Sequence, residues 1–347
     1  MTASETAATQ LSLSGRLAAW RYAFRTTNPP EAGVVDGVTR WLVVTRAGVL
    51  PLTLFSGMIA LLLAAVSSHP HPIDWLGLVL ALVGILVAHV ANNMMNDLAD
   101  TQTGTDTLDY PRALYAPHPI LAGLVTKRQL VIAILAANVV DLVIMIVLAV
   151  RHGWPIVAFA LAGLFLSYAY TAPPLRLKKY GLGELDVLIT WGPLMVGGVY
   201  YAGLGTVPWQ VLLAATVYAL LPTTVLMGKH IDKIPYDAPD GTHTLPVLLG
   251  DGRARAFTRG LLVLYYLGVI ACVLAGAMPW PALLTLVALI TLWPTWKAFG
   301  APKPTERPEG DVVWPLWFAA IAFVHMRRAG GLLVLGLAAA AIWHAVP

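Results

Sequence analysis

The stretch DWLGLVLALVGILVAHVANNMMNDLAD, residues 74–100, contains the first evidence for the fold. Its run 74–95 is almost wholly apolar and has the length that a helix needs to cross a hydrocarbon core of about 30 Å. A membrane-spanning strand needs only about half that length, and the alternation of polar and apolar residues typical of a barrel strand is absent. The stretch therefore predicts a transmembrane helix that ends in an acidic segment at one membrane surface.

Apolar runs of similar length recur along the chain. Of its 347 residues, 58% are hydrophobic and 12% are charged, and this charge fraction is about half that of an ordinary soluble domain. Nine runs are long enough to span a membrane, near 49–66, 74–95, 129–149, 155–172, 184–203, 208–228, 257–277, 280–296 and 329–346. The shorter apolar stretch 312–326 is expected to form an interfacial or half-buried helix. These runs predict an all-α membrane protein of about nine transmembrane helices, with a tail at 1–40 and one transmembrane domain at 41–347.

The basic residues predict the orientation of these helices. With the N-terminus in the cytoplasm, 21 of the 22 Lys and Arg residues fall on the inner side, and only Arg151 lies in an outer loop. The positive-inside rule therefore predicts an inner-membrane protein whose tail and long loops face the cytoplasm. The net charge of +4 fits topology and attraction to anionic lipid better than nucleic-acid binding. The single cysteine, Cys272, excludes a disulfide framework and a thiolate metal site.

Four polar side chains share one face at the end of the helix predicted over 74–95. They follow the spacing i, i+3, i+4 and i+7, as Asn93, Asn96, Asp97 and Asp100. His89 extends this face one turn into the membrane, and Asp106 follows a Gly-containing turn. As an alternative, the segment NDLAD is a polar helix end that leads into a solvated loop.

This arrangement of acids is unfavourable without a partner. Asp97 and Asp100 are like charges three residues apart, and they lie at a helix C-terminus, where the helix dipole disfavours anions. A divalent cation removes both penalties, and carboxylate and amide oxygens without cysteine suit Mg²⁺. Because Mg²⁺ is usually shared between one or two carboxylates and substrate phosphates, a phosphate ligand is expected. Arg112 is placed to contact it.

A second acid-rich segment, GKHIDKIPYDAPDGTHTLPVLLG at 228–250, follows the sixth run. Its acids are Asp232, Asp237 and Asp240, and the basic or imidazole side chains among them are Lys229, His230, Lys233 and His243. Two acid-rich cytoplasmic segments in separate halves of the chain suggest one diphosphate held between two Mg²⁺ clusters. The alternative is a hydrophilic loop with Pro and Gly turns.

Two further features are candidates for function. The loop after the fourth run contains polar side chains that could neutralise a leaving diphosphate, namely Tyr168, Tyr170, Arg176, Lys178 and Lys179. Positive-inside signalling explains the same loop, and for Lys179 it is the preferred explanation. Asp141 lies inside the run 129–149, where a carboxylate is costly and marks a functional candidate or a buried hydrogen bond.

These segments together resemble the UbiA superfamily of intramembrane prenyltransferases. Within it, the chain is most similar to the dihydroxynaphthoate polyprenyltransferases of menaquinone synthesis, through NDLADTQTGTD, YTAPPLRLKKYGLGELDVLITWGPLMVGGVYY and GTHTLPVLLGDGRAR. The resemblance covers residues 41–346 and implies nine helices around a central cavity, with Mg²⁺ bound to the diphosphate of a polyprenyl donor. It implies a first metal site at Asp97, Asp100 and Asp106, and it matches Asp237 to the second aspartate of the second motif.

The second motif departs from the family pattern. Lys233 stands where the family has the first aspartate of D-x-x-x-D, and His230 stands where it has asparagine. Asp232, one place earlier, either replaces the missing ligand through a local shift or belongs to an altered second metal site.

The expected reaction is transfer of a polyprenyl group to an aromatic acceptor, which the resemblance identifies as dihydroxynaphthoate. Ionisation of the allylic C–O bond, stabilised by Mg²⁺ and basic side chains, would give a carbocation shielded from water in an apolar cavity. Another aromatic acceptor, or a terpene cyclase that captures the cation within its own chain, fits the same scaffold. A transporter is a more distant alternative, because transporters place charge near the midplane on broken helices, whereas these acids concentrate at one face.

Overall fold

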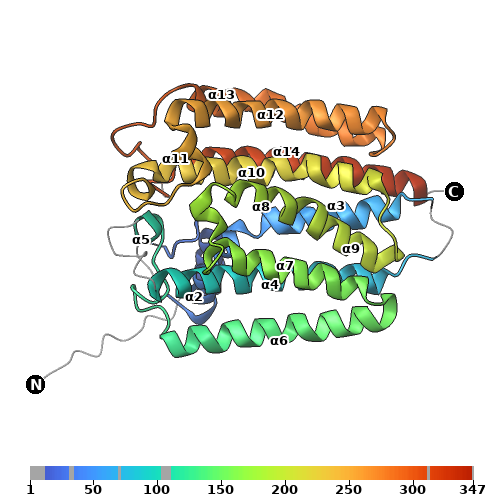
Figure 1. Cartoon of the computed structure of the whole chain (residues 1–347), viewed down its shortest axis with the longest axis horizontal. Helices are drawn as coiled ribbons and strands as arrows, with labels where there is room; N and C mark the ends of the chain where they lie inside the picture. Colours follow the sequence, from blue (N-terminus) through green and yellow to red (C-terminus); the bar gives the residue numbers. More distant parts are fainter. Residues whose placement is uncertain (1–11, 31–34, 69–71, 103–110, 311–312, 346–347) are drawn as a thin grey trace, which may run out of the picture.

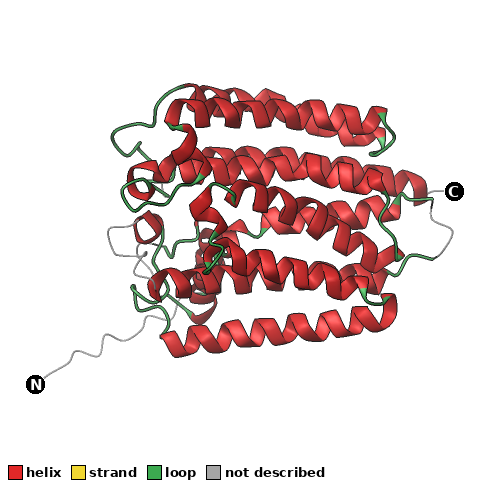
Figure 2. Ribbon diagram, in the orientation of Figure 1, coloured by secondary structure: helices red, strands yellow, loops and turns green. Residues whose placement is uncertain are grey.

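The computed structural model describes residues 12–30, 35–68, 72–102, 111–310 and 313–345, and these form a bundle of helices without strands (Figures 1 and 2). In chain order the elements are α1 (Leu13–Thr26), α2 (Gly37–Val44), η1 (Ala47–Val49), α3 (Pro51–Ala65), α4 (Trp75–Gln102), α5 (Pro111–Tyr115), α6 (Lys127–His152), α7 (Pro155–Thr171), η2 (Leu177–Tyr180), α8 (Gly183–Ile189), η3 (Thr190–Leu194), α9 (Met195–Leu204), α10 (Trp209–Asp237), α11 (Leu245–Leu249), α12 (Asp251–Leu274), η4 (Trp280–Thr291), α13 (Leu292–Gly300) and α14 (Trp317–Ala345). α2 straddles residue 40, the predicted end of the tail.

The long helices run side by side, as Figure 1 shows. Within the described ranges, eight helical segments are long and apolar enough to cross a membrane, and α7 is a shorter apolar helix of 17 residues. The predicted all-α membrane protein with about nine spans is thereby confirmed. The C-terminal region differs from the expectation, because 312–326 and 329–346 do not form two helices. Residues Trp317–Ala345 make one continuous helix, α14.

α10 is the central helix of the bundle. It is the most buried of the candidate spans, and it packs against α8, α12 and α14. Small residues allow the close approach: a Cβ on Gly228 would lie 2.7 Å from the Phe318 backbone at the start of α14. Such small-residue contacts are typical of helices that associate in lipid, where tight packing replaces the hydrophobic driving force.

The span that contains α8 and α9 is interrupted by a π-helical segment, η3. Gly192 within it has φ −98° and ψ −109°, and Pro193 follows without a backbone N–H. A Cβ on Gly192 would lie 2.8 Å from the Ala219 Cβ of α10, so glycine is required where the two backbones meet. Single-turn π segments inside helices often occur at functional sites, and η3 lines the internal cavity of the bundle.

Hydrogen bonds around Asp74 connect α4, α6 and α9 at one end of the bundle, because the Asp74 amide donates to the Gly203 carbonyl at 2.9 Å and the Tyr201 hydroxyl donates to the His152 carbonyl at 3.2 Å. Asp74 accepts hydrogen bonds from Arg151 Nε at 2.7 Å and from the Gly77 amide at 2.9 Å, and His152 Nε2 lies 2.9 Å away. The Arg151 guanidinium holds the pKa of the Asp74 carboxyl well below its usual range. Helix α4 is 28 residues long, and its acidic end lies at the opposite end of the bundle.

Candidate active site

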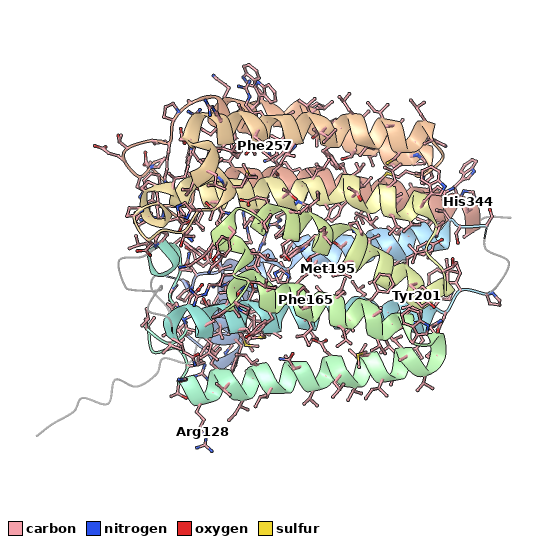
Figure 3. The ribbon with its side chains drawn as sticks, in the orientation of Figure 1. Arg128, Phe165, Met195, Tyr201, Phe257 and His344 are labelled. Atoms are coloured by element: carbon pink, nitrogen blue, oxygen red, sulfur yellow. The ribbon has the colours of Figure 1, made fainter. Side chains whose placement is uncertain are left out.

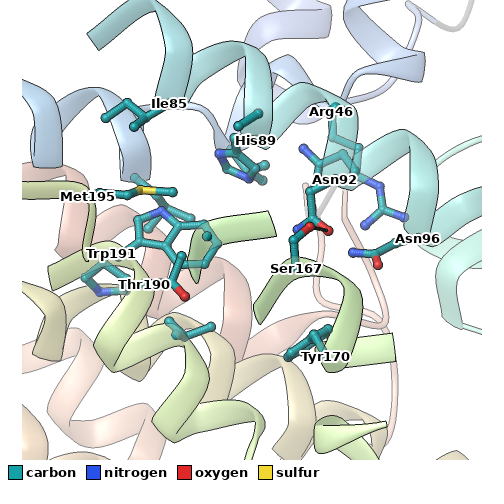
Figure 4. A pocket seen from close by; sticks show the side chains of 18 of the residues that line it. Arg46, Ile85, His89, Asn92, Asn96, Ser167, Tyr170, Thr190, Trp191 and Met195 are labelled. Atoms are coloured by element: carbon teal, nitrogen blue, oxygen red, sulfur yellow. Dashed lines mark hydrogen bonds between the residues drawn. The ribbon is translucent and has the colours of Figure 1, made fainter. Parts of the chain in front are cut away.

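A cavity of about 560 Å³ lies between α4, α6, α7, α10 and the α8–η3–α9 span. Figure 3 shows the side chains that fill the bundle, and Figure 4 shows the cavity from close by. Arg46, Asn92 and Asn96 gather at one side of the close-up, and Ile85, Trp191 and Met195 gather at the other (Figure 4). The cavity therefore has a polar end beside the acidic segment of α4 and an apolar end deeper in the bundle.

Asp97 is fully buried at the polar end and forms an ion pair with Arg46. His118 Nε2 lies 3.8 Å from the same carboxylate oxygen. The backbone amides of Ile120 and Leu121 donate to His118 Nδ1, so Nε2 holds the ring proton, and Nε2 lies 3.3 Å from the Thr101 hydroxyl oxygen. One turn earlier, Asn93 donates to the Thr45 carbonyl at 3.1 Å, which holds the segment before Arg46 against α4.

Asp100 lies one turn beyond Asp97 and is paired with Lys178 from η2. Lys178 Nζ lies 2.9 and 3.1 Å from the two carboxylate oxygens. Hydrogen bonds join the same face of α4 to α7, because Thr171 donates to Asn96 at 2.8 Å. The predicted polar face of α4 is therefore held between the segment around Arg46 on one side and the α7–η2 region on the other.

The second acid-rich segment is the end of α10, and it reaches the same place. Lys233 Nζ lies 3.1 Å from Asp237 one turn later. Lys229 lines the cavity and is close enough to Arg46, Lys178 and Asp100 to interact with them electrostatically. The structure thus brings together Asp97, Asp100, Lys178, Lys229, Lys233 and Asp237.

Two buried acids from α8 join this cluster. Glu184 Oε1 lies 2.7 Å from His230 Nδ1, and both side chains are almost fully buried. Glu184, Asp186, Asp100 and Asp237 all interact electrostatically with the Tyr170 side chain. His230 therefore contacts α8, and the polar end of the cavity contains acids from α4, α8 and α10.

Asp232 is directed away from the other acids of the cluster. Its Oδ2 accepts a hydrogen bond from the Ala319 amide in the first turn of α14 at 2.9 Å, and Lys303 Nζ lies 3.5 Å from Oδ1. A carboxylate at a helix N-terminus satisfies an amide without an intrahelical partner and is favoured by the helix dipole. The structure places Asp232 as a cap of α14, and this geometry favours an altered second motif over a shifted metal ligand.

Several predicted residues lie outside the cluster or outside the described residues. Asp106 and the Arg112 side chain lie outside the described residues. Asp240 and His243 are exposed. Asp141 lines the cavity from α6, and its buried Oδ1 has no hydrogen-bond partner among the described residues. Among the residues that the structure describes, no three His, Cys, Asp or Glu side chains form a group that could hold a metal ion without other ligands.

Sequence reasoning missed Arg46, Glu184 and Asp186. In the sequence, Arg46 is only one of the 21 basic residues predicted on the inner side, and no local pattern links it to Asp97, 51 residues later. The two acids of GELD do have a local signal, because they open an apolar run, and an ionisable side chain in a membrane span is a functional candidate by default. The same rule identified Asp141.

The arrangement suits an anionic phosphate-containing group attached to an apolar tail. Arg and Lys side chains bind phosphate groups, and the acids beside them can share a divalent cation with those phosphates. The apolar end of the cavity accommodates hydrocarbon. The fold and the site define an integral membrane protein. Its cavity lies between the spans and carries charged side chains at the end near the helix termini.

Comparison with known proteins identifies the family. Residues 54–309 match the UbiA prenyltransferase family, so the chain belongs to this family and is a prenyltransferase. It is similar to the 1,4-dihydroxy-2-naphthoate octaprenyltransferase of Haemophilus influenzae, with 29% identity over 255 residues, covering 72% of this chain and 82% of that one.

Solved structures share the fold. A UbiA homologue from Aeropyrum pernix K1 superposes with a TM-score of 0.63 at 18% identity, covering 83% of this chain and 97% of its own. A UbiA homologue from Archaeoglobus fulgidus bound to GPP and Mg²⁺ has a TM-score of 0.52 at 16% identity, covering 85% of this chain and 99% of its own. The predicted family and fold are confirmed.

Proposed function

We propose that this protein transfers a polyprenyl group from its diphosphate to 1,4-dihydroxy-2-naphthoate, as a step of menaquinone biosynthesis. The observation that carries the proposal is the meeting of Asp100, Lys178 and Lys229 beside one end of a cavity whose other end is apolar. The relative from Haemophilus influenzae supports the choice of acceptor, because it is named for that substrate.

Mg²⁺ is the metal that fits this site. Its donors are carboxylate and amide oxygens, which suit a hard cation, and the solved homologue from Archaeoglobus fulgidus is bound to Mg²⁺ together with GPP. Since Mg²⁺ usually takes only one or two carboxylates and completes its shell with water and phosphate oxygens, a closed cage of protein acids is not required. Asp97, Asp100 and Asp237 would hold it, and it would neutralise charge on the leaving diphosphate.

The basic side chains have the complementary role. Arg46 and Lys178 are each close enough to Lys229 to interact with it electrostatically, and their repulsion with Lys229 is relieved when a diphosphate lies among them. The same cations stabilise the negative charge that develops as the allylic C–O bond breaks and the diphosphate leaves with the electron pair.

The apolar part of the cavity protects the resulting allylic cation from water. The ring carbon that bears the acceptor's carboxylate then forms the new C–C bond, and loss of this carboxylate as CO₂ returns the electron pair of the broken C–C bond to the ring and restores its aromaticity. The bilayer suits this chemistry because a polyprenyl chain leaves lipid only at a cost of about 0.8 kcal/mol per CH₂.

We further propose that the site faces the cytoplasm from the inner membrane. Arg46, Lys178 and Lys229 lie at the polar end of the bundle, whereas Arg151 lies at the other end with Asp74. The positive-inside rule then sets the polar end in the cytoplasm.

The test is mass spectrometry of products from the purified protein in detergent with Mg²⁺ and a prenyl diphosphate. A prenylated, decarboxylated naphthoquinol should form only when dihydroxynaphthoate is present. A cyclised or hydroxylated terpene in samples with and without acceptor would instead identify a cyclase and would overturn the proposal. Diphosphate binding without product would direct the search to other aromatic acceptors.

A further inference from the structure

Three polar side-chain atoms of residues that line the cavity are buried and have no hydrogen-bond partner among the described residues. They are Asp186 Oδ1, Thr190 Oγ1 and Trp191 Nε1, and all three residues line the cavity. Buried polar groups in folded proteins are almost always hydrogen-bonded, and each unpaired one is unfavourable. Three such exceptions within one short segment of the cavity lining, residues 186–191, therefore indicate groups that a ligand completes.

The three residues form a row along the α8–η3 segment, which runs inward from the polar end of the cavity, where the diphosphate is proposed to bind. Asp186 is the outermost and interacts electrostatically with Tyr170. Thr190 follows one helical turn later, and Trp191 is next to it in the π-helical segment. The Trp191 ring meets the His89 ring edge to face, with centroids 5.2 Å apart, and Figure 4 shows both beside Ile85 and Met195 at the apolar side.

The surrounding structure fixes the inner part of this row. His89 Nδ1 is hydrogen-bonded to Thr53 at 2.7 Å, and the Trp191 carbonyl accepts a hydrogen bond from Ser56 at 2.7 Å. Gly192 packs directly on α10. The Trp191 side chain is therefore presented by a backbone that is anchored on two sides, which is a requirement for a specific binding site.

We propose that Asp186, Thr190 and Trp191 form the binding subsite for the oxygen substituents of a hydroxylated aromatic acceptor. The inference rests on the proposed prenyl transfer. In that reaction the acceptor carbon must lie beside the first carbon of the prenyl chain, and this carbon is bonded to the diphosphate. The row occupies the corresponding place, immediately inward from the diphosphate end.

The chemistry of the row selects this ligand. The Asp186 oxygen accepts a hydrogen bond from a phenolic hydroxyl, the Trp191 N–H donates to a phenolic or carboxylate oxygen, and the Thr190 hydroxyl does either. A prenyl tail has no polar atoms to offer these groups. An arene with at least two oxygen substituents satisfies all three.

Three conservative substitutions test the subsite, namely Asp186→Asn, Thr190→Val and Trp191→Phe. Each should raise KM for dihydroxynaphthoate about 10- to 100-fold, because a hydrogen bond to a charged or buried partner is lost. KM for the prenyl diphosphate should stay within about twofold of wild type. Thr190→Ser, which keeps the hydroxyl, should restore the wild-type KM.

Matched controls come from the same residue types elsewhere in the bundle. Thr216→Val removes a hydroxyl bonded only to its own helix at Leu212, and Trp209→Phe changes an exposed indole at the start of α10. Neither should alter KM for the acceptor. Chromatography in detergent and thermal unfolding of every variant identify any that fail to fold.

An acceptor analogue supplies a readout that a purely structural role would not affect. Wild type should discriminate strongly against a naphthoate that lacks one hydroxyl, because the subsite would leave buried groups unpaired. Asp186→Asn and Thr190→Val should lose most of this discrimination. Unchanged acceptor KM and unchanged discrimination in all three variants would overturn the subsite.

Binding measured without turnover separates this inference from the proposed function. Calorimetric titration of dihydroxynaphthoate into the protein, with an unreactive prenyl diphosphate analogue present, reports the subsite alone. Acceptor binding that weakens in the three variants supports the subsite even if no prenyl transfer occurs, in which case the proposed function fails. Wild-type protein that binds the analogue but no hydroxylated arene overturns the subsite.

Discussion

Two charged clusters lie at opposite ends of α4, and they differ in how completely their carboxylates are satisfied. At one end, both oxygens of Asp74 are hydrogen-bonded, one to the Gly77 amide and the other to Arg151. At the other end, Asp97 and Asp100 are paired with Arg46 and Lys178. Beside this second cluster, however, Glu184 Oε2 and Asp186 Oδ1 are buried without a hydrogen-bond partner among the described residues.

The comparison distinguishes a structural cluster from a site that binds a ligand. A satisfied cluster lowers the free energy of the fold, whereas buried polar atoms without partners raise it unless a ligand completes them. The Asp74 cluster holds three helices together. The cluster at the other end has Lys229 in addition to its two ion pairs, and Arg46, Lys178 and Lys233 are close enough to Lys229 to interact with it electrostatically, which fits the proposed binding of an anion there.

The largest expected effect tests the role of the acids of α4. Asp97→Asn and Asp100→Asn should each lower prenyl transfer about 10³-fold, because a carboxylate proposed to hold Mg²⁺ beside the leaving group is lost. Turnover and thermal unfolding should be measured together on the purified variants. Asp251→Asn is the matched control, since this acid pairs with Arg255 on a partly exposed surface of α12. Full activity of either α4 variant would contradict the proposed role of that aspartate in Mg²⁺ binding.

The next effect separates two neighbouring lysines. Lys178→Met should raise KM for the prenyl diphosphate about 10- to 100-fold, because a charge-assisted contact is lost. Lys179→Met removes the same charge one residue later and should leave KM within about twofold, since its side chain is expected to serve membrane topology. Equal effects of the two substitutions would show that only the total charge of the loop matters.

A smaller effect, on stability, tests Asp232. Asp232→Asn should destabilise the protein by about 1 kcal/mol, because the carboxylate caps the N-terminus of α14. Activity per folded molecule should remain within about twofold of wild type, whereas Asp237→Asn should lose activity. A stable Asp232→Asn protein with no Mg²⁺-dependent turnover would reverse the assignment and restore the shifted-ligand alternative.

The smallest effect is expected at Asp74. Asp74→Asn should lower the thermal midpoint by about 1–3 °C at pH 7 and leave activity per folded molecule unchanged. Because Arg151 depresses the pKa of Asp74 in the folded protein, its stabilisation is present above the unfolded pKa of about 3.9 and is lost as pH falls through the folded pKa. Midpoints of wild type and variant should therefore converge as the pH is lowered. A difference that grows as the pH falls below about 3.9 would contradict this account.

Several features could be predicted from the sequence because they depend on local properties. Apolar runs predict the spans, since run length alone decides whether a helix can cross the bilayer. The spacing of Asn93, Asn96, Asp97 and Asp100 predicts a shared helix face, since side-chain direction repeats every 3.6 residues. The same local reasoning failed between 312 and 346, where polar residues inside α14 looked like a break between two helices.

Only the tertiary structure decided which charges meet. Arg46 and Asp97 are separated by 51 residues and Asp232 and Ala319 by 87, so no local pattern records their contact. Helix packing, set by close approaches such as Gly228 on Phe318 and Gly192 on Ala219, turns each side chain toward one neighbour or another. The sequence by itself therefore determined the spans and the end of the bundle that holds the acids. Packing decided that Asp237 joins the cluster while Asp232 caps α14, because α10 directs the two carboxylates to different sides.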